Sequence, residues 1–158
     1  MGRGIAQIAT QAGSITKLMD AQAGAAQKAR DALFAQWDKL VEKGRIEATV
    51  ANSHKQRLQV VDSLAELADC DLIVEAIVER LDIKKTLFAE LESLVSASTV
   101  LASNTSSLSV TAIAAALKRP ERFTGYHFFN PVPLMKVVEV IAGLKTSPAV
   151  CSGLSDYA

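Results

Sequence analysis

The sequence predicts an α/β fold built on a doubly wound parallel sheet. Short runs of apolar, strand-forming residues alternate with helical patterns along the chain, and the run LIV at 72–74 is apolar without interruption. Strands of this kind are buried on both faces, as in a parallel sheet that helices cover on each side. With no internal repeat, low-complexity segment or Pro/Gly-rich linker, the 158 residues are expected to form one domain.

The first part of the chain predicts a helix, a strand and a pair of helices. Ile5 and Ile8 have helical spacing, and Gly13 lacks the side chain that would oppose a left-handed helix end. Over residues 21–43 apolar residues keep to one face, which is typical of an amphipathic helix. The expected elements are a helix ending near Gly13, a strand at 14–20, and helices at 21–43 and 47–54. The two later helices form a long helical insertion after the strand.

Strands and helices alternate through the rest of the chain. Leu87, Leu91 and Leu94 repeat on one face of a helix expected at 81–95. A Ser-rich segment precedes a second helix, expected at 108–117, which its hydroxyl groups can cap. Apolar and β-branched runs predict strands at 58–62, 70–77, 99–104, 123–129 and 136–141.

Composition argues against several classes of function. The 17 basic and 17 acidic side chains cancel, so no net field draws the chain to nucleic acid or to an anionic membrane. The apolar runs are much shorter than the ~20 residues that span a bilayer. Cys70 and Cys151 lack the spacing of a metal site. We therefore expect reduced thiols, no bound metal, no nucleic-acid or membrane partner, and a cytoplasmic location.

Two side chains indicate acid–base chemistry on residue type alone. His127 ends a predicted strand before a Pro-containing loop, where catalytic groups of open α/β sheets gather, and so is a candidate general base. A partly buried histidine without a chemical role accounts for this pattern at least as well. Glu139 lies in an apolar strand, where a carboxylate is costly unless it has a partner. Because each side chain meets the other's need, we expect them to pair.

The N-terminal residues match part of a dinucleotide-binding turn. In such domains a first strand leads into a Gly-rich turn and then a helix, whose N-terminus binds the pyrophosphate. That strand is missing before Met1, so Gly2 would be the third glycine of the turn, and the strands at 14–20 and 70–77 would each keep an unpaired edge. Asp20 follows Gly2 by about 18 residues, near the ~20-residue offset of the acidic residue that binds the ribose. A helix N-cap is an alternative or additional role for Asp20.

Three segments resemble a known family. They are DLIVEAIVERLDIKK at 71–85, SNTSSLSV at 103–110 and GYHFFNPVPLMKVVEV at 125–140. Together they resemble the 3-hydroxyacyl-CoA dehydrogenases, which oxidise 3-hydroxyacyl-CoA thioesters with NAD in fatty-acid and related acyl-CoA metabolism. The resemblance covers nearly the whole chain and implies a Rossmann-like fold with NAD as its cofactor.

The resemblance also implies roles for single residues. His127 would be the general base, Glu139 would hold it, and Ser106 would bind the substrate hydroxyl near a helix N-terminus that favours negative charge. A plain N-cap is the other role open to Ser106, although Ser107 could fill it. Asn130 would lie beside both substrate and cofactor. The implied cofactor contacts are Gly2, Asp20, Glu79, Lys84 and Asn130.

Parts of the family pattern have no match here, namely the first strand with its two glycines and a C-terminal helical domain that completes the substrate site and carries dimer contacts. We therefore expect residues 1–158 to be an incomplete dinucleotide-binding domain, truncated at both ends and inactive alone, whose parent is a homodimer. A non-catalytic nucleotide-binding module and a self-associating fragment are the alternatives. The acyl chain stays open, whereas Asp20 favours NAD by repelling the 2′-phosphate of NADP.

Overall fold

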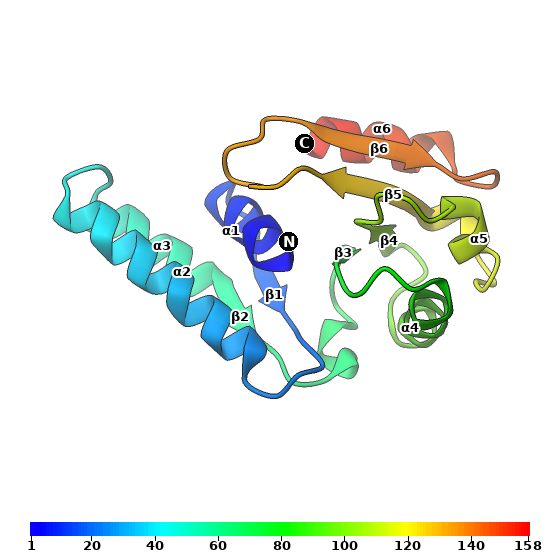
Figure 1. Ribbon diagram of the computed structural model, residues 1–158, viewed down its shortest axis with the longest axis horizontal. Coiled ribbons are helices and arrows are strands. Elements are labelled where there is room, and N and C mark those ends of the chain that lie inside the picture. Colours follow the sequence, from blue (N-terminus) through cyan, green and yellow to red (C-terminus); the bar gives the residue numbers. More distant parts are fainter. The chain divides into compact units, whose positions relative to one another are not determined.

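A computed structural model describes all of residues 1–158 (Figure 1). The chain divides into two compact units, which are residues 1–66 with 131–133 and residues 67–130 with 134–158. Each unit has its own sheet, with strand order β1-β2 in the first and β3-β4-β5-β6 in the second.

Helices and strands alternate as expected. The first unit contains α1 (Gly2–Gln11), β1 (Thr16–Leu18), α2 (Ala25–Glu42), α3 (Ala48–Arg57) and β2 (Leu58–Val60). The second contains β3 (Leu72–Glu75), α4 (Leu81–Leu94), β4 (Val100–Ser103), α5 (Val110–Ala114), β5 (Phe123–Phe128), β6 (Val138–Ala142) and α6 (Pro148–Tyr157). Short 3-10 helices occupy Leu64–Leu67 and Pro120–Arg122. Each predicted strand is present but shorter than its apolar run, and α6 was not predicted. No helix has both the length and the apolar composition of a membrane-spanning segment.

Strand direction departs from the prediction at one place. β1 and β2 are parallel, as are β3, β4 and β5, but β6 runs antiparallel to β5. A parallel neighbour needs a long crossover, usually helical, whereas residues 129–137 connect β5 to β6 without a helix. The expectation of parallel strands throughout is therefore wrong for β6. β1 pairs only with β2 and β3 only with β4, so each has one edge without a paired strand.

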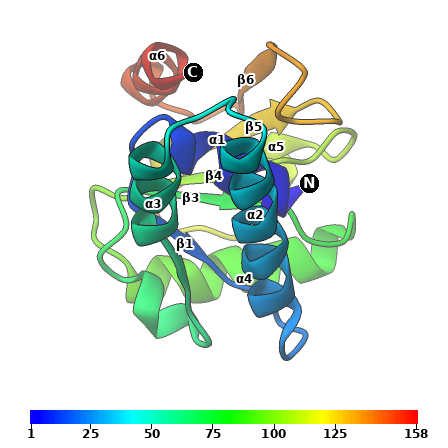
Figure 2. The same cartoon turned by 90° about the vertical axis from the view of Figure 1, so that its left-hand side faces the viewer.

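A compact apolar cluster holds the first unit together. Leu33 and Trp37 of α2 are buried with Ala51 of α3, Leu58 of β2 and Ala6 of α1. Figure 2 shows α2 and α3 side by side, which is how their apolar faces share this cluster. The sheet of this unit has only two short strands. The amphipathic α2 that follows β1 therefore buries its apolar face in this cluster, together with the other helices of the unit.

His54 of α3 is buried in this cluster without a hydrogen-bond partner for Nδ1. Its ring lies against that of Trp37, with 5.3 Å between ring centroids, and Nε1 of Trp37 also lacks a partner. Burial lowers the pKa of His54, and the nearby charge of Arg57 lowers it further. The folded unit therefore favours the neutral imidazole.

Helices cover β5 of the second unit on both faces. Phe123 contacts Phe88 of α4 edge to face, at 4.7 Å between ring centroids, while the Tyr126 hydroxyl on the opposite face donates to the carbonyl of Leu154 in α6. Gly125 lies where α5 and β6 approach the strand most closely. A Cβ at this position would stand 2.9 Å from Cγ2 of Val110. Glycine is thus required two residues before His127.

Acid should destabilise the first unit through His54. The pKa of His54 in the folded unit lies below the unfolded value of 6.5, so the neutral imidazole makes its full contribution to the free energy of unfolding above pH 6.5. This contribution is lost as the pH falls from 6.5 toward the folded pKa. Fluorescence of Trp37, the single tryptophan, should give a lower denaturant midpoint at about pH 5.5 than at about pH 7.5. His54→Leu cannot gain this proton and should remove most of the difference. An unchanged difference in His54→Leu would assign the effect to other groups.

Gly125→Ala should destabilise the second unit by about 1–3 kcal/mol, because the added methyl group overpacks the contact with α5 and β6. Gly153→Ala is the matched control, since a Cβ there meets no atom within 4 Å. Its helical position predicts no loss, or a gain of up to about 1 kcal/mol. Urea unfolding of both variants measures the difference, and equal stability would mean that α5 and β6 yield to the methyl group.

Candidate active site

His127 and Glu139 stand opposite each other in the antiparallel ladder of β5 and β6. Nδ1 of His127 lies 2.8 Å from Oε2 of Glu139, so the expected hydrogen bond is present. Directly opposed side chains on one face of an antiparallel pair are close neighbours, which explains the contact. With Nδ1 donating to the carboxylate, Nε2 is the nitrogen left to accept a proton.

The reason given for this pairing from the sequence is wrong. The side chain of Glu139 is 53% exposed, whereas that of His127 is 18% exposed. β6 is the last strand of its sheet, so its apolar sequence does not bury the carboxylate. Glu139 thus meets His127 through strand register and not through a need to neutralise a buried charge.

A buried cluster of charges lies at the carboxyl end of β3. Nζ of Lys84, in α4, is 2.6 Å from Oε1 of Glu75 and 3.2 Å from Oε2 of Glu79. The side chains of Lys84 and Glu75 are each 1% exposed, and that of Glu79 is 37% exposed. Buried ions are tolerated when they are paired and hydrogen-bonded, and both conditions hold here. Glu79 and Lys84 were expected at this site from the sequence, whereas Glu75 was not.

The other oxygen of Glu79 binds the turn that follows β4. Oε1 accepts hydrogen bonds from the hydroxyls of Thr105 and Ser107 and from the backbone amides of Ser106, at 3.0 Å, and Ser107, at 3.3 Å. A carboxylate of the protein itself therefore occupies the donors of this turn. The hydroxyl of exposed Ser106 has no hydrogen-bond partner within the protein.

The helix expected after this turn begins later than predicted. α5 starts at Val110, and its N-cap is Ser109, whose hydroxyl accepts from the amide of Ala112 at 3.2 Å. The capping roles considered for Ser106 and Ser107 are therefore wrong, and Ser106 does not lie at a helix N-terminus. A helix N-terminus was expected at this turn to favour negative charge on a ligand. Instead, the carboxylate of Glu79 brings a negative charge of the protein itself to the backbone amides of the turn and accepts their hydrogen bonds.

Asn104 links this turn to the strand that carries His127. Its Oδ1 accepts from the amide of Phe128 at 2.8 Å, and its own amide donates to the carbonyl of Glu75 at 2.8 Å. The side chain thus extends the hydrogen bonding between β4 and β5 beyond the last paired residues. Asn130 lies exposed shortly after β5. Sequence analysis assigned no role to Asn104, although it lies inside the quoted segment SNTSS.

Gly2 and Asp20 belong to the first unit. Gly2 is the first residue of α1, and the N-cap, Met1, makes no side-chain hydrogen bond, so side chains leave this helix end uncapped. Asp20 is exposed after β1, and its Oδ1 accepts from the amide of Gln22 at 2.8 Å. The N-cap of α2 is Gly24, so Asp20 caps a turn and not the helix. Asp20, Gly24 and Val61 are among the residues lining a hollow of about 230 Å³.

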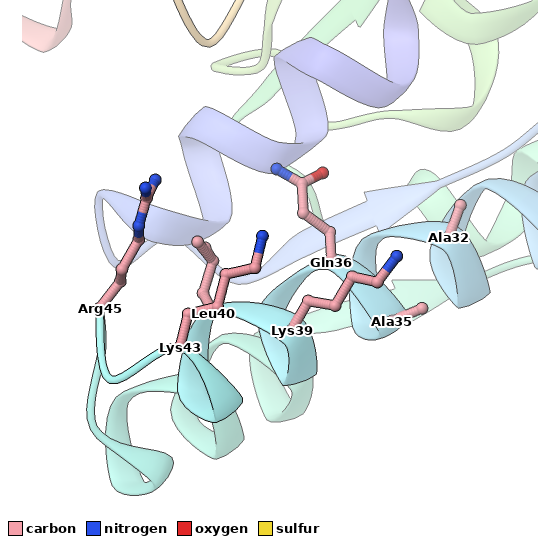
Figure 3. A pocket seen from close by; sticks show the side chains of 7 residues that line it. All are labelled: Ala32, Ala35, Gln36, Lys39, Leu40, Lys43 and Arg45. Carbon is pink, nitrogen blue, oxygen red and sulfur yellow. The ribbon is translucent and has the colours of Figure 1, made fainter.

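A second hollow lies along α2 of the first unit (Figure 3). It is lined by Ala32, Ala35, Gln36, Lys39, Leu40, Lys43 and Arg45. Three of these residues are cations and none is acidic, and Figure 3 shows Gln36, Lys39 and Arg45 extending to the same side of the helix. No group of three or more His, Cys, Asp or Glu side chains is arranged to hold a metal ion.

A family model described as "3-hydroxyacyl-CoA dehydrogenase, NAD binding domain" matches residues 1–158. The chain belongs to this family. It is 44% identical over 156 residues to the 3-hydroxyadipyl-CoA dehydrogenase of Escherichia coli K12, covering 99% of this chain and 33% of that protein. It is 43% identical over 147 residues to a probable 3-hydroxybutyryl-CoA dehydrogenase of Bacillus subtilis, covering 93% of this chain and 51% of the relative.

A solved structure shows the same fold. The crystal structure of a 3-hydroxybutyryl-CoA dehydrogenase from Escherichia coli K12 matches with a TM-score of 0.96 and 43% identity, over 99% of this chain and 33% of that chain. The chain therefore spans about a third to a half of the length of these dehydrogenase relatives.

Groups in this dehydrogenase-family chain fit the cofactor that defines the family. The N-terminus of α1 presents backbone amides free of side-chain caps, as a pyrophosphate requires. A close approach of the helix supports this end, because a Cβ on Gly4 would stand 2.9 Å from Cβ of Val132 in the same unit. The exposed carboxylate of Asp20 beside its hollow matches the acceptor that ribose hydroxyls need.

The pKa of Glu79 gives the first test of the site. Burial raises this pKa, but hydrogen bonds from Thr105, Lys84 and Ser107 and the charge of Lys84 outweigh burial and lower it from 4.5 to about 2. The turn is therefore fully stabilised above pH 4.5 and loses this contribution as the pH falls from 4.5 to about 2.

Thr105→Val removes one of these hydrogen bonds and should raise the pKa of Glu79 toward 4.5, as measured by NMR titration of the side-chain carboxyl carbon. Thr111→Val is the control, because its hydroxyl accepts from the amide of Leu144 and not from the site. Identical titration curves for Thr105→Val and the unmodified chain would show that the threonine hydroxyl does not hold Glu79.

Proposed function

We propose that this chain provides the NAD contacts and the proton-accepting pair for oxidation of the 3-hydroxyl of a 3-hydroxyacyl-CoA to the 3-oxoacyl-CoA. The observation that carries the proposal is the 2.8 Å separation of His127 Nδ1 and Glu139 Oε2, within the segments HFFNP and VVEV that resemble the family motif. The printed names of the relatives, 3-hydroxyadipyl- and 3-hydroxybutyryl-CoA dehydrogenase, support this class of substrate.

His127 would take the proton of the substrate hydroxyl at Nε2, since Nδ1 is engaged by Glu139. Glu139 would keep the ring in this tautomer and stabilise the imidazolium that forms. Ser106 would hydrogen-bond the same substrate oxygen through its unpartnered hydroxyl, while Glu79 holds its backbone. Bound NAD would supply the hydride acceptor that this oxidation needs. A positioned general base of this kind contributes about 10²–10⁴ in rate.

Each unit carries residues that we propose as cofactor contacts. In the first unit, Gly2 at the start of α1 would receive the pyrophosphate, and Asp20 would accept from the adenosine ribose. In the second unit, Glu79 and Asn130 would line the nicotinamide-ribose side, while Lys84, which the sequence resemblance also assigned to it, is buried and would act by holding Glu79. Residues 1–158 would thus act as a dinucleotide-binding domain, with further parts of the catalytic site supplied from outside these residues.

The cationic hollow on α2 suits the phosphate groups of coenzyme A. Lys39, Lys43 and Arg45 surround it with no acid among the lining residues, so an anionic group bound there gains favourable charge interactions.

Turnover can be tested in a chimera of the Bacillus subtilis relative, in which residues 1–158 of this chain replace the matching segment. The match covers 51% of that protein, so the rest of the relative completes the chimera. His127→Gln in this chimera should lower kcat by about 10²-fold or more, with an NAD Kd within about threefold, since the base acts in the chemical step. NADH absorbance with 3-hydroxybutyryl-CoA measures kcat, and calorimetry measures the NAD Kd. His54→Gln, at the other histidine, is the control and should keep its turnover.

A chimera that binds NAD but turns over no hydroxyacyl-CoA would favour a non-catalytic nucleotide-binding module. A His127→Gln variant that loses NAD binding but keeps kcat would reverse the roles assigned here.

A further inference from the structure

Glu75 is a buried charge to which the proposed reaction gives no role. Glu75 ends β3 with its side chain 1% exposed, too deep to contact a substrate. Its carboxylate nevertheless has a full set of partners. Oε1 accepts from Nζ of Lys84 and from the amide of Ile77, each at 2.6 Å, and Oε2 accepts from the hydroxyl of Ser103 at 2.6 Å.

We propose that Glu75 is a positioning residue, whose carboxylate fixes the ammonium of Lys84 and the hydroxyl of Ser103 and thereby sets the place of the turn at Ser106. The inference rests on the proposed function, because Ser106 is the residue assigned to the substrate oxygen. Glu75 acts through other side chains and so is not a catalytic residue.

The first route from Glu75 to the turn runs through Lys84. The ammonium is shared between Glu75 and Glu79, at 2.6 and 3.2 Å, and Glu79 uses its other oxygen to hold the amide of Ser106. Lys84 is itself 1% exposed, so it cannot exchange Glu75 for water without leaving its site. A fixed Lys84 therefore fixes the carboxylate of Glu79, which binds the turn at Ser106.

The second route runs through Ser103 and does not involve Lys84. The Ser103 side chain is fully buried at the end of β4 and donates to Oε2 of Glu75. The same hydroxyl oxygen accepts from the amide of Thr105 at 3.3 Å. Since Thr105 precedes Ser106, both oxygens of Glu75 lead to the same turn.

Stability alone does not explain a charge at this position. Replacing a buried ion pair by uncharged side chains of similar volume is often neutral or stabilising, whereas removing one partner is costly. A strand end that only needed burial would be satisfied by an apolar residue. The charge at Glu75 is instead directional, because it determines where a buried ammonium and a buried hydroxyl must lie.

The test compares Glu75→Gln with the double variant Glu75→Gln/Lys84→Met, both in residues 1–158. Glu75→Gln keeps the side-chain shape and should lower stability, since it leaves Lys84 with Glu79 as its only carboxylate. The double variant removes both buried charges and should recover much of that stability. In both variants the amides of Ser106 and Ser107 should shift in the NMR spectrum and exchange with solvent about tenfold faster, as expected for the loss of roughly one hydrogen bond.

Glu92→Gln is the matched control. The Glu92 carboxylate also accepts from two backbone amides, those of Lys118 and Arg119, and lies 3.6 Å from Arg122, but it is not bonded to the turn. This variant should lose stability without changing the Ser106 and Ser107 signals. The proposal would be overturned if the double variant recovered its stability while the chemical shift and exchange rate of its Ser106 amide stayed as in the unmodified chain.

The same variants in the chimera separate this inference from the proposed function. An unmodified chimera without turnover would count against the function, while the Ser106 signals would still test the role of Glu75. In an active chimera we expect the double variant to lose about tenfold in kcat, in line with the loosened turn. Unchanged kcat together with altered Ser106 signals would overturn the link between Glu75 and the reaction.

Discussion

The parallel register of β3, β4 and β5 is the constraint on which the site of the second unit depends. Parallel strands end at the same edge of a sheet, and Glu75 pairs with Ser103 in the ladder of β3 and β4, as Ser103 does with Gly125 in that of β4 and β5. The residues just beyond these pairs therefore meet. Asn104 completes the junction with a side-chain hydrogen bond to Phe128, beside His127.

Electrostatics then organises this edge. Lys84 is surrounded by two carboxylates, and the more exposed of them, Glu79, extends the cluster to the amides after β4. A loop with several free amides is a binding site for any nearby anion, and here the protein occupies it with its own side chain. The turn that presents Ser106 is held from beneath by a charge network, while the Ser106 hydroxyl stays available to a ligand.

The two units solve the problem of a small sheet in different ways. In the first unit two short strands are covered by α1, α2 and α3 through a cluster centred on Trp37. The helical hairpin contributes Leu33, Trp37 and Ala51 to this cluster, and it also presents the cationic hollow. The second unit has four strands, and polar groups gather at the edge where its parallel strands end.

The sequence by itself determined the alternation of helices and strands, the ends of α1 and α2 near glycines, and the family; it also named His127 and Glu139 as partners, although the register of β5 and β6 is what brings them together. These features follow from local periodicity, from the backbone freedom of glycine and from residue motifs, all of which are written along the chain. Only the tertiary structure decided the direction of β6, the exposure of Glu139 and the burial of Glu75. Strand direction and burial depend on neighbours far away in the chain. A carboxylate in an apolar strand needs a partner when it is buried, which holds for Glu75, at 1% exposed, and not for Glu139, at 53% exposed. Both residues lie on end strands of the same sheet, so only the packing around each strand distinguishes them.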